Sequence, residues 1–136
     1  MLVRCVGNLG IHVAKKDFVA GQIFPQTHFE LVIGVVYSCY AISIYDGHIS
    51  FLVEESDNHP FWCPQSLFEV IDSKLPESWN VFIVKDSRLQ MIVGYAAMGE
   101  PDHYDGLQER EPKDMAIFRR MKRELLLKSQ KSDDVD

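Results

Sequence analysis

Long apolar runs, basic leader segments and motifs for chemistry are all missing from this chain of 136 residues. No stretch approaches the roughly 20 consecutive apolar residues that a membrane-spanning helix needs, so we expect no membrane partner. A secretory signal has a basic segment, then an apolar stretch and a small-residue cleavage site, and the N-terminus lacks this pattern. These absences predict a cytoplasmic protein.

Cysteine is scarce as well. Cys5, Cys39 and Cys63 are an odd number, and they lie far apart among apolar neighbours. This pattern is neither a disulfide framework nor a zinc-finger spacing. We expect reduced, buried thiols that behave as small hydrophobic side chains and have little thiolate character.

Motifs for catalysis, metal binding and phosphate binding are also missing. The chain has no Gly-x-Ser-x-Gly elbow, and Gly7-Asn-Leu-Gly10 lacks the spacing of either nucleotide fingerprint. The nearest metal candidate joins His48, His59 and Cys63, whose spacing does not match a standard zinc site. The sequence therefore predicts a non-enzymatic protein with no catalytic, metal-binding or cofactor-binding residues and no small-molecule substrate.

Charge is present but unevenly distributed, within a formal net charge of −6. Residues 1–112 carry 7 basic and 15 acidic side chains, a balance of −8. Residues 113–131 carry 7 basic and 2 acidic side chains, a balance of +5, and three aspartates follow in residues 132–136. An acidic body should repel nucleic acid and attract cationic surfaces.

Strand signals dominate the middle of the chain. Asp46-Gly47 separates two runs rich in β-branched and aromatic residues, 35–45 and 48–54, and Asp-Gly in that setting is typical of a two-residue hairpin turn. Further strands are predicted at Leu2–Val6, Phe61–Cys63, Leu67–Val70, Trp79–Val84 and Leu89–Val93. Residues 7–27 and 94–106 show no sustained period, and we expect both to be irregular.

One helix is predicted near the C-terminus. Pro112 suits the first turn of a helix, and an apolar stripe at 3/4 spacing follows it, made of Met115, Ile117, Phe118, Met121 and Leu125. We therefore predict a helix over about 112–128 and a disordered acidic tail over 129–136. The whole pattern predicts a mainly β fold over residues 1–128, a small antiparallel barrel or roll of five or six strands with one C-terminal α-helix.

The sequence leaves two alternative binding functions. The first is an acidic surface at predicted turns and strand ends, which would contact a basic protein through Asp46, Glu54, Glu55, Asp57, Trp62, Asp102 and Asp105. Acids that only keep the protein soluble are the other interpretation of these residues. The alternative function is a nucleic-acid-binding or regulatory barrel that uses the basic helix, although the balance of −8 argues against nucleic acid.

Short motifs spread over residues 29–125 resemble a diffuse set of small bacterial proteins with SH3-like barrels. The residues that carry this resemblance are Leu31-x-x-Gly34-x-x-Tyr37, Trp62-x-Pro64-x-x-Leu67-Phe68-Glu69-Val70-x-Asp72, Trp79, Tyr104-Asp105-Gly106-Leu107 and the helix around Phe118. The resemblance implies an SH3-like barrel. Some members resemble immunity proteins, which are encoded beside toxins and neutralise them by binding. For this chain the resemblance implies an immunity protein that caps a basic toxin domain through an acidic surface.

Overall fold

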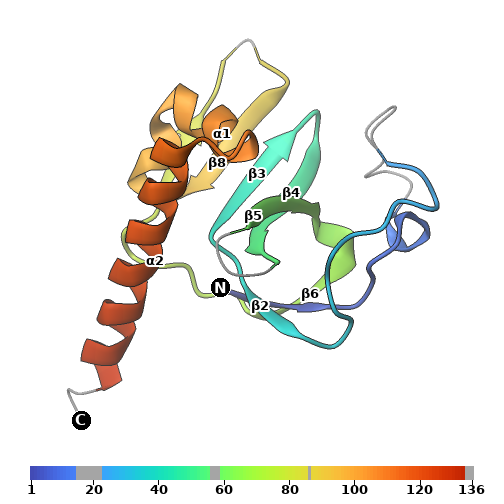
Figure 1. Ribbon diagram of the computed structural model, residues 1–136, viewed down its shortest axis with the longest axis horizontal. Coiled ribbons are helices and arrows are strands. Elements are labelled where there is room, and N and C mark those ends of the chain that lie inside the picture. Colours follow the sequence, from blue (N-terminus) through green and yellow to red (C-terminus); the bar gives the residue numbers. More distant parts are fainter. Residues whose placement is uncertain (15–22, 56–58, 86, 134–136) are drawn as a thin grey trace.

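The structure, a computed structural model, describes residues 1–14, 23–55, 59–85 and 87–133 (Figure 1). In these residues eight strands form two antiparallel sheets, and two α-helices follow them in the chain. The strands are β1 (Leu2–Cys5), β2 (Val36–Ser38), β3 (Ala41–Tyr45), β4 (His48–Glu54), β5 (Pro60–Pro64), β6 (Phe68–Asp72), β7 (Asn80–Ile83) and β8 (Leu89–Gly94). The helices are α1 (Pro101–Gln108) and α2 (Pro112–Asp133).

The predicted mainly β fold with a C-terminal helix is confirmed, and so is the hairpin. Asp46 and Gly47 both have positive φ, 48° and 78°, as a type I′ turn requires. The single strand predicted over residues 35–45 is wrong, because the chain divides it between the two sheets. β2 pairs with β1 in a sheet of order β2-β1-β6, and β3 pairs with β4 and β8 in a sheet of order β5-β4-β3-β8-β7.

The irregular segment predicted over residues 94–106 is also wrong. It holds the 3₁₀ turn η4 (Ala96–Gly99) and most of α1. The signals for α1 are weak because the helix has only eight residues and presents a single apolar pair, Tyr104 and Leu107, to the protein interior. Pro101 occupies its first turn. At the other end of the fold, α2 continues to Asp133, beyond the predicted end near Lys128.

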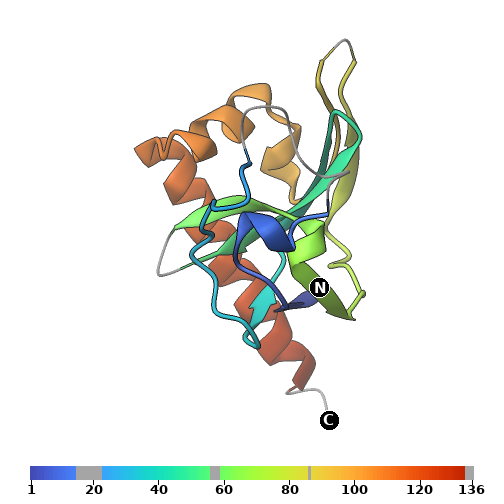
Figure 2. The ribbon, with the colours of Figure 1, turned by 90° about the vertical axis from the view of Figure 1, so that its right-hand side faces the viewer.

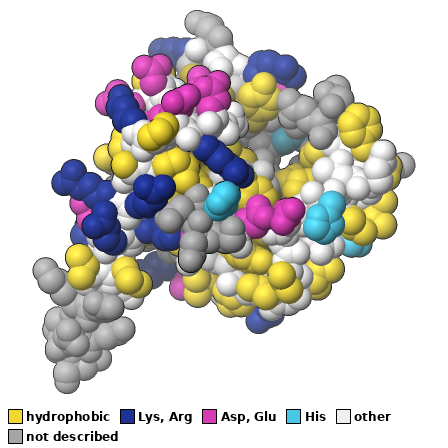
Figure 3. All heavy atoms as spheres, viewed as in Figure 1, with side chains coloured by type: hydrophobic (Ala, Val, Ile, Leu, Met, Phe, Trp, Pro, Cys, Tyr) yellow, Lys and Arg dark blue, Asp and Glu magenta, His cyan; other side chains and the backbone are white. Residues whose placement is uncertain are grey.

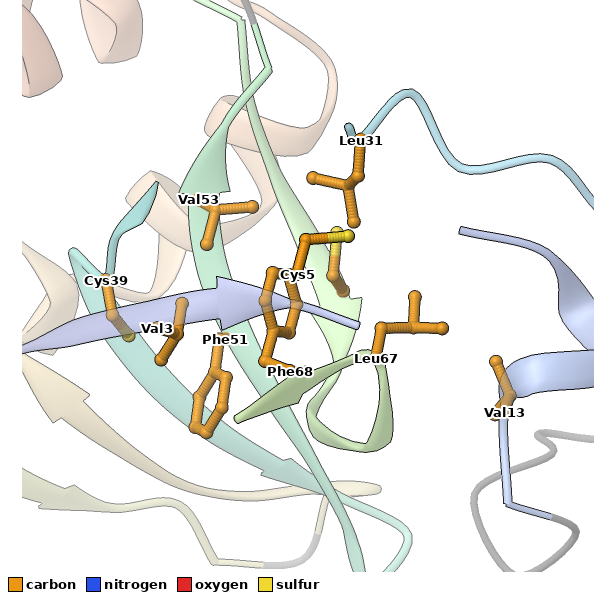
Figure 4. Packing of buried hydrophobic residues seen from close by; sticks show 10 residues of the cluster. Val3, Cys5, Val13, Leu31, Cys39, Phe51, Val53, Leu67 and Phe68 are labelled. Atoms are coloured by element: carbon orange, nitrogen blue, oxygen red, sulfur yellow. The ribbon is translucent and has the colours of Figure 1, made fainter. Parts of the chain in front are cut away.

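One hydrophobic core lies between the two sheets. Val3 and Cys5 of β1 pack against Phe51 of β4, Cys63 of β5 and Phe68 of β6 (Figure 4). All three cysteines are buried and unpaired, as predicted. Burial raises the pKa of the Cys39 thiol to about 11, and it also raises the pKa of Cys5 and of Cys63. The thiols therefore stay protonated at neutral pH and behave as small hydrophobic side chains.

A second core lies on the opposite face of the five-stranded sheet, under the helices. Phe118 of α2 and Leu107 of α1 pack there against Leu52 and Ile92. Figures 1 and 2 show α2 running along the side of the molecule and past the sheets, so that its last turns have no β-structure beside them. Leu126 and Leu127 are accordingly exposed. No helix in the described residues is both long enough and apolar enough to cross a membrane.

Candidate functional site

A groove of about 1010 Å³ lies beside α1 and is lined by residues of α1 and of the five-stranded sheet. Tyr45, Trp62 and Phe82 contribute aromatic side chains from the sheet, and Tyr104 contributes one from α1. Glu100 and Asp105 line the helix side of the same space, and one cation, Lys85, lines it just beyond β7. We call the four aromatic residues and the two acids together the acidic groove.

Strand register explains why the sheet residues point into the acidic groove. Residues directly opposite each other on antiparallel strands share one face of a sheet. Ser50, Ser43, Ile92 and Phe82 form one such row across β4, β3, β8 and β7. Trp62 belongs to the neighbouring row on the same face, opposite Leu52 of β4. Alternation along each strand therefore gathers the aromatic rings on the face that α1 covers.

The α1 side of the acidic groove is held by aromatic packing. The rings of Tyr104 and Trp62 have their centroids 5.4 Å apart. Burial raises the pKa of Tyr104, hydrogen bonds to the side chains of Ser43 and Gln108 lower it, and the nearby Tyr45 and Asp105 raise it. The indole N–H of Trp62 is buried and has no acceptor among the described residues. Ring packing, and not a hydrogen bond, therefore sets the position of Trp62.

The start of α1 is locked against β7 by a glycine. A Cβ on Gly99 would lie 2.5 Å from Cε1 of Phe82, so only a residue without a side chain lets η4 approach the ring this closely. Glu100 follows immediately and lines the acidic groove. The same close contact therefore positions both the helix and its first acid.

The surface over α1 is strongly acidic. Residues 100–111 contain five carboxylates, at Glu100, Asp102, Asp105, Glu109 and Glu111, and one cation, Arg110. Figure 3 shows acidic side chains gathered near α1, with basic side chains beside them, and mainly basic side chains lower down, along α2. The acids are therefore concentrated at the α1 end, and the cations of α2 form a basic flank.

The residues predicted as a partner surface do not form one face. Trp62 and Asp105 line the acidic groove, and the exposed Asp102 precedes Asp105 by one helical turn. Asp46 is paired with Arg88 in the hairpin, at 2.6 Å between Oδ2 and Nη2. Glu54 is mostly buried and bonds to Lys122 of α2 at 2.7 Å.

Glu55 and Asp57 are the two remaining residues of the predicted partner surface. The side chain of Glu55 is hydrogen-bonded to that of Glu30. Asp57 falls in residues 56–58, which lie outside the described residues. Of the predicted residues, Trp62 and Asp105 therefore line the acidic groove, whereas Asp46, Glu54 and Glu55 are engaged with other side chains.

The Glu30–Glu55 pair gives a pH-dependent prediction. Burial raises the pKa of Glu55, and the hydrogen bond and charge of Glu30 raise it further. A raised carboxyl pKa favours the folded state at low pH, and this contribution is lost as the pH rises through the folded pKa. Glu30→Gln is therefore expected to raise the free energy of unfolding at pH 7 by less than about 1 kcal/mol, with no gain at acidic pH. Urea titrations at the two pH values measure this, and an equal change at both would contradict it.

Four of the six residues of the acidic groove were not predicted as site residues. Tyr45, Phe82 and Tyr104 are too common in sheet and helix interiors to be singled out without their register, and Glu100 sits in a segment predicted to be irregular. The Gly99-Glu100-Pro101 sequence was the available signal, since proline after an acid marks a helix start.

Sequence reasoning also missed a buried polar network behind the acidic groove. The hydroxyl of Tyr95 lies 2.7 Å from Nε2 of His103, and Nδ1 of His103 lies 2.8 Å from Oδ1 of Asp114. All three residues are buried. An ionised carboxylate can only accept, so Nδ1 of His103 donates to Asp114; Nε2 accepts the Tyr95 proton in a neutral ring and donates to the Tyr95 oxygen in a protonated one. The network joins the start of η4 to both helices.

No group of three or more His, Cys, Asp or Glu residues in the described part of the chain is placed to hold a metal ion. Searches of protein-family models, curated proteins and solved structures find no match for this chain. The resemblance to small SH3-like barrels and to immunity proteins stays a prediction.

Proposed function

We propose that this chain is a non-enzymatic protein-binding module, and most concretely an immunity protein that neutralises a cognate toxin. The observation that carries the proposal is the acidic groove, where aromatic rings and carboxylates line one concave surface beside an acidic helix. We limit the proposed contact surface to the acidic groove and α1, because Asp46 and Glu54 are already paired with cations.

The chemistry of the acidic groove suits a cationic protein segment. Carboxylates of Glu100 and Asp105 would attract Lys or Arg side chains and speed their approach. Tyr104 and Trp62 offer aromatic faces, on which such cations bind favourably. Rings of this kind are also the side chains that commonly anchor protein interfaces. The partner we propose is therefore a basic toxin domain.

The test uses growth of cells that produce the toxin encoded beside this chain. Co-production of the wild-type chain should restore growth and yield a complex on purification. The double variant Glu100→Lys/Asp105→Lys should weaken the complex by about ten-fold or more, because it reverses both groove charges. The control Glu77→Lys/Glu124→Lys changes net charge equally at exposed positions outside the groove and should protect as the wild type does. Growth arrest with the wild-type chain, and no complex, would contradict the proposal.

The basic flank of α2 gives less support to the nucleic-acid alternative. Lys122 is held by Glu54, and Arg120 pairs with Glu124. A second groove of about 1220 Å³ follows this part of α2, where two acids, Asp72 and Glu77, face five cations, Lys74, Arg119, Lys122, Arg123 and Lys128. This groove is the place where a nucleic acid would bind, but the balance of −8 over residues 1–112 opposes a phosphate backbone, so we favour the protein partner.

A further inference from the structure

Strand β7 is an edge strand without the usual protection. It ends the five-stranded sheet, and its four residues include no charge and no proline. The other edges in the described residues are guarded: β5 begins and ends with proline, β6 carries Glu69 and Asp72, and β2 has only three residues. Proteins normally guard such edges because unpaired backbone groups invite another strand.

The hydrogen-bonding groups that β7 leaves free can be assigned. The amide of Val84 donates to the carbonyl of Gln90 on the β8 side, at 3.0 Å. Backbone groups in an antiparallel ladder alternate sides, so those of Asn80 and Phe82 also face β8. The N–H and C=O groups of Val81 and Ile83 therefore point away from the sheet, toward the open edge.

The two faces beside this edge differ in chemistry. On the face turned away from the helices, register gives two apolar rows, Phe51–Ile42–Val93–Val81 and Ile49–Ile44–Met91–Ile83. Both rows end in exposed side chains, with Val81 60% and Ile83 67% exposed. On the other face, Phe82 lines the acidic groove with the acids Glu100 and Asp105, and one cation, Lys85, follows β7 at its end.

We infer that β7 receives an added β-strand from the partner protein, an extended segment in which apolar and basic residues alternate. Its apolar side chains would lengthen the two apolar rows past Val81 and Ile83. Its Lys or Arg side chains would fall on the opposite face, toward Glu100 and Asp105. Main-chain hydrogen bonds supply affinity in such strand addition, and alternate side chains supply specificity. This inference rests on the proposed function and specifies how the partner is held.

The test uses a synthetic ten-residue peptide of alternating Val/Ile and Lys/Arg, with a matched peptide in which Glu replaces the basic residues. The basic peptide should bind the wild-type chain, and the acidic one about ten-fold or more less tightly. Ile83→Pro removes an outward N–H without touching the β8 ladder, and it should weaken binding of the basic peptide by about ten-fold or more. Ile83→Thr keeps the N–H and should bind within a few-fold of the wild type.

Hydrogen exchange locates the added strand directly. The amides of Val81 and Ile83 should become protected when the basic peptide binds, while the amides of Asn80 and Phe82 are protected before it is added. No binding, or equal binding by Ile83→Pro, would overturn the inference. Protection of Val81 and Ile83 in the peptide-free protein, with a doubled mass in sedimentation, would also overturn it by placing a second copy on β7.

The two proposals fail in different ways. If Ile83→Pro binds the basic peptide normally while Glu100→Lys/Asp105→Lys loses the toxin, strand addition is wrong and the acidic groove stands. If the charge reversal leaves toxin capture unchanged, the proposed function is wrong whatever the peptide does.

Discussion

Phe118→Asp is expected to detach α2 from the sheet and to leave little folded protein. Phe118 is fully buried, and its ring meets that of Tyr40 edge-to-face at 5.2 Å. Truncating a buried phenylalanine to alanine alone costs about 3–5 kcal/mol, and aspartate adds the cost of a buried, unpaired charge. Small proteins have only about 5–15 kcal/mol of net stability. Far-UV circular dichroism during urea unfolding measures the loss.

The matched control for this substitution lies on the same helix. Leu126 is 62% exposed, so Leu126→Asp should change the free energy of unfolding by less than about 0.5 kcal/mol. If Phe118→Asp unfolds at the same urea concentration as Leu126→Asp, α2 does not contribute its apolar stripe to the core, and the fold described above is wrong.

Asp114→Ala is the second substitution with a large expected effect. It leaves the buried Nδ1–H of His103 without its acceptor, and an unsatisfied buried donor costs roughly 1–3 kcal/mol. Asp105→Ala removes an exposed carboxylate from α1 and should cost less than about 0.5 kcal/mol. The free energies of unfolding of the two variants, measured side by side, separate the buried network from the surface acids.

Combining Gly106→Ala with Asp114→Ala gives a double-mutant cycle that tests the position of the Asp114 carboxylate. A Cβ on Gly106 would overlap the carboxylate of Asp114, so Gly106→Ala should destabilise the wild-type protein. In the Asp114→Ala background that overlap is gone, and alanine inside a helix is favoured over glycine by up to about 1 kcal/mol. The effect of Gly106→Ala should therefore change sign between the two backgrounds. Equal effects in both would show that the carboxylate does not occupy the place described.

Much of the sheet could be predicted from local signals. Asp46-Gly47 favours a turn whose two residues have positive φ, and apolar and polar side chains alternate along most of His48–Glu54. The break between β2 and β3 could not be predicted. Residues 35–45 are uniformly rich in β-branched and aromatic side chains, and only pairing with β1 or with β4 tells the two strands apart. Helix α1 escaped prediction because its helical state depends on contacts from outside, such as Gly99 against Phe82.

The site was less predictable than the fold. Acidic residues in predicted turns were treated as one surface, but sequence does not show which of them find cations across the fold. Asp46 reaches Arg88, and Glu54 reaches Lys122, 68 positions further along the chain. Trp62 and Asp105 share one concavity with Tyr104, which only the folded structure shows, and their role in partner binding stays a prediction.

The central claim is that the acidic groove captures a basic protein, and its most direct test is the salt dependence of the association rate. The wild-type chain should bind the toxin encoded beside it fastest at low salt, with a steep fall as salt is added. Glu100→Lys/Asp105→Lys should associate about ten-fold more slowly at low salt and approach the wild type at high salt. An association rate that the groove reversal leaves unchanged, or that Glu77→Lys/Glu124→Lys lowers equally, would contradict the account.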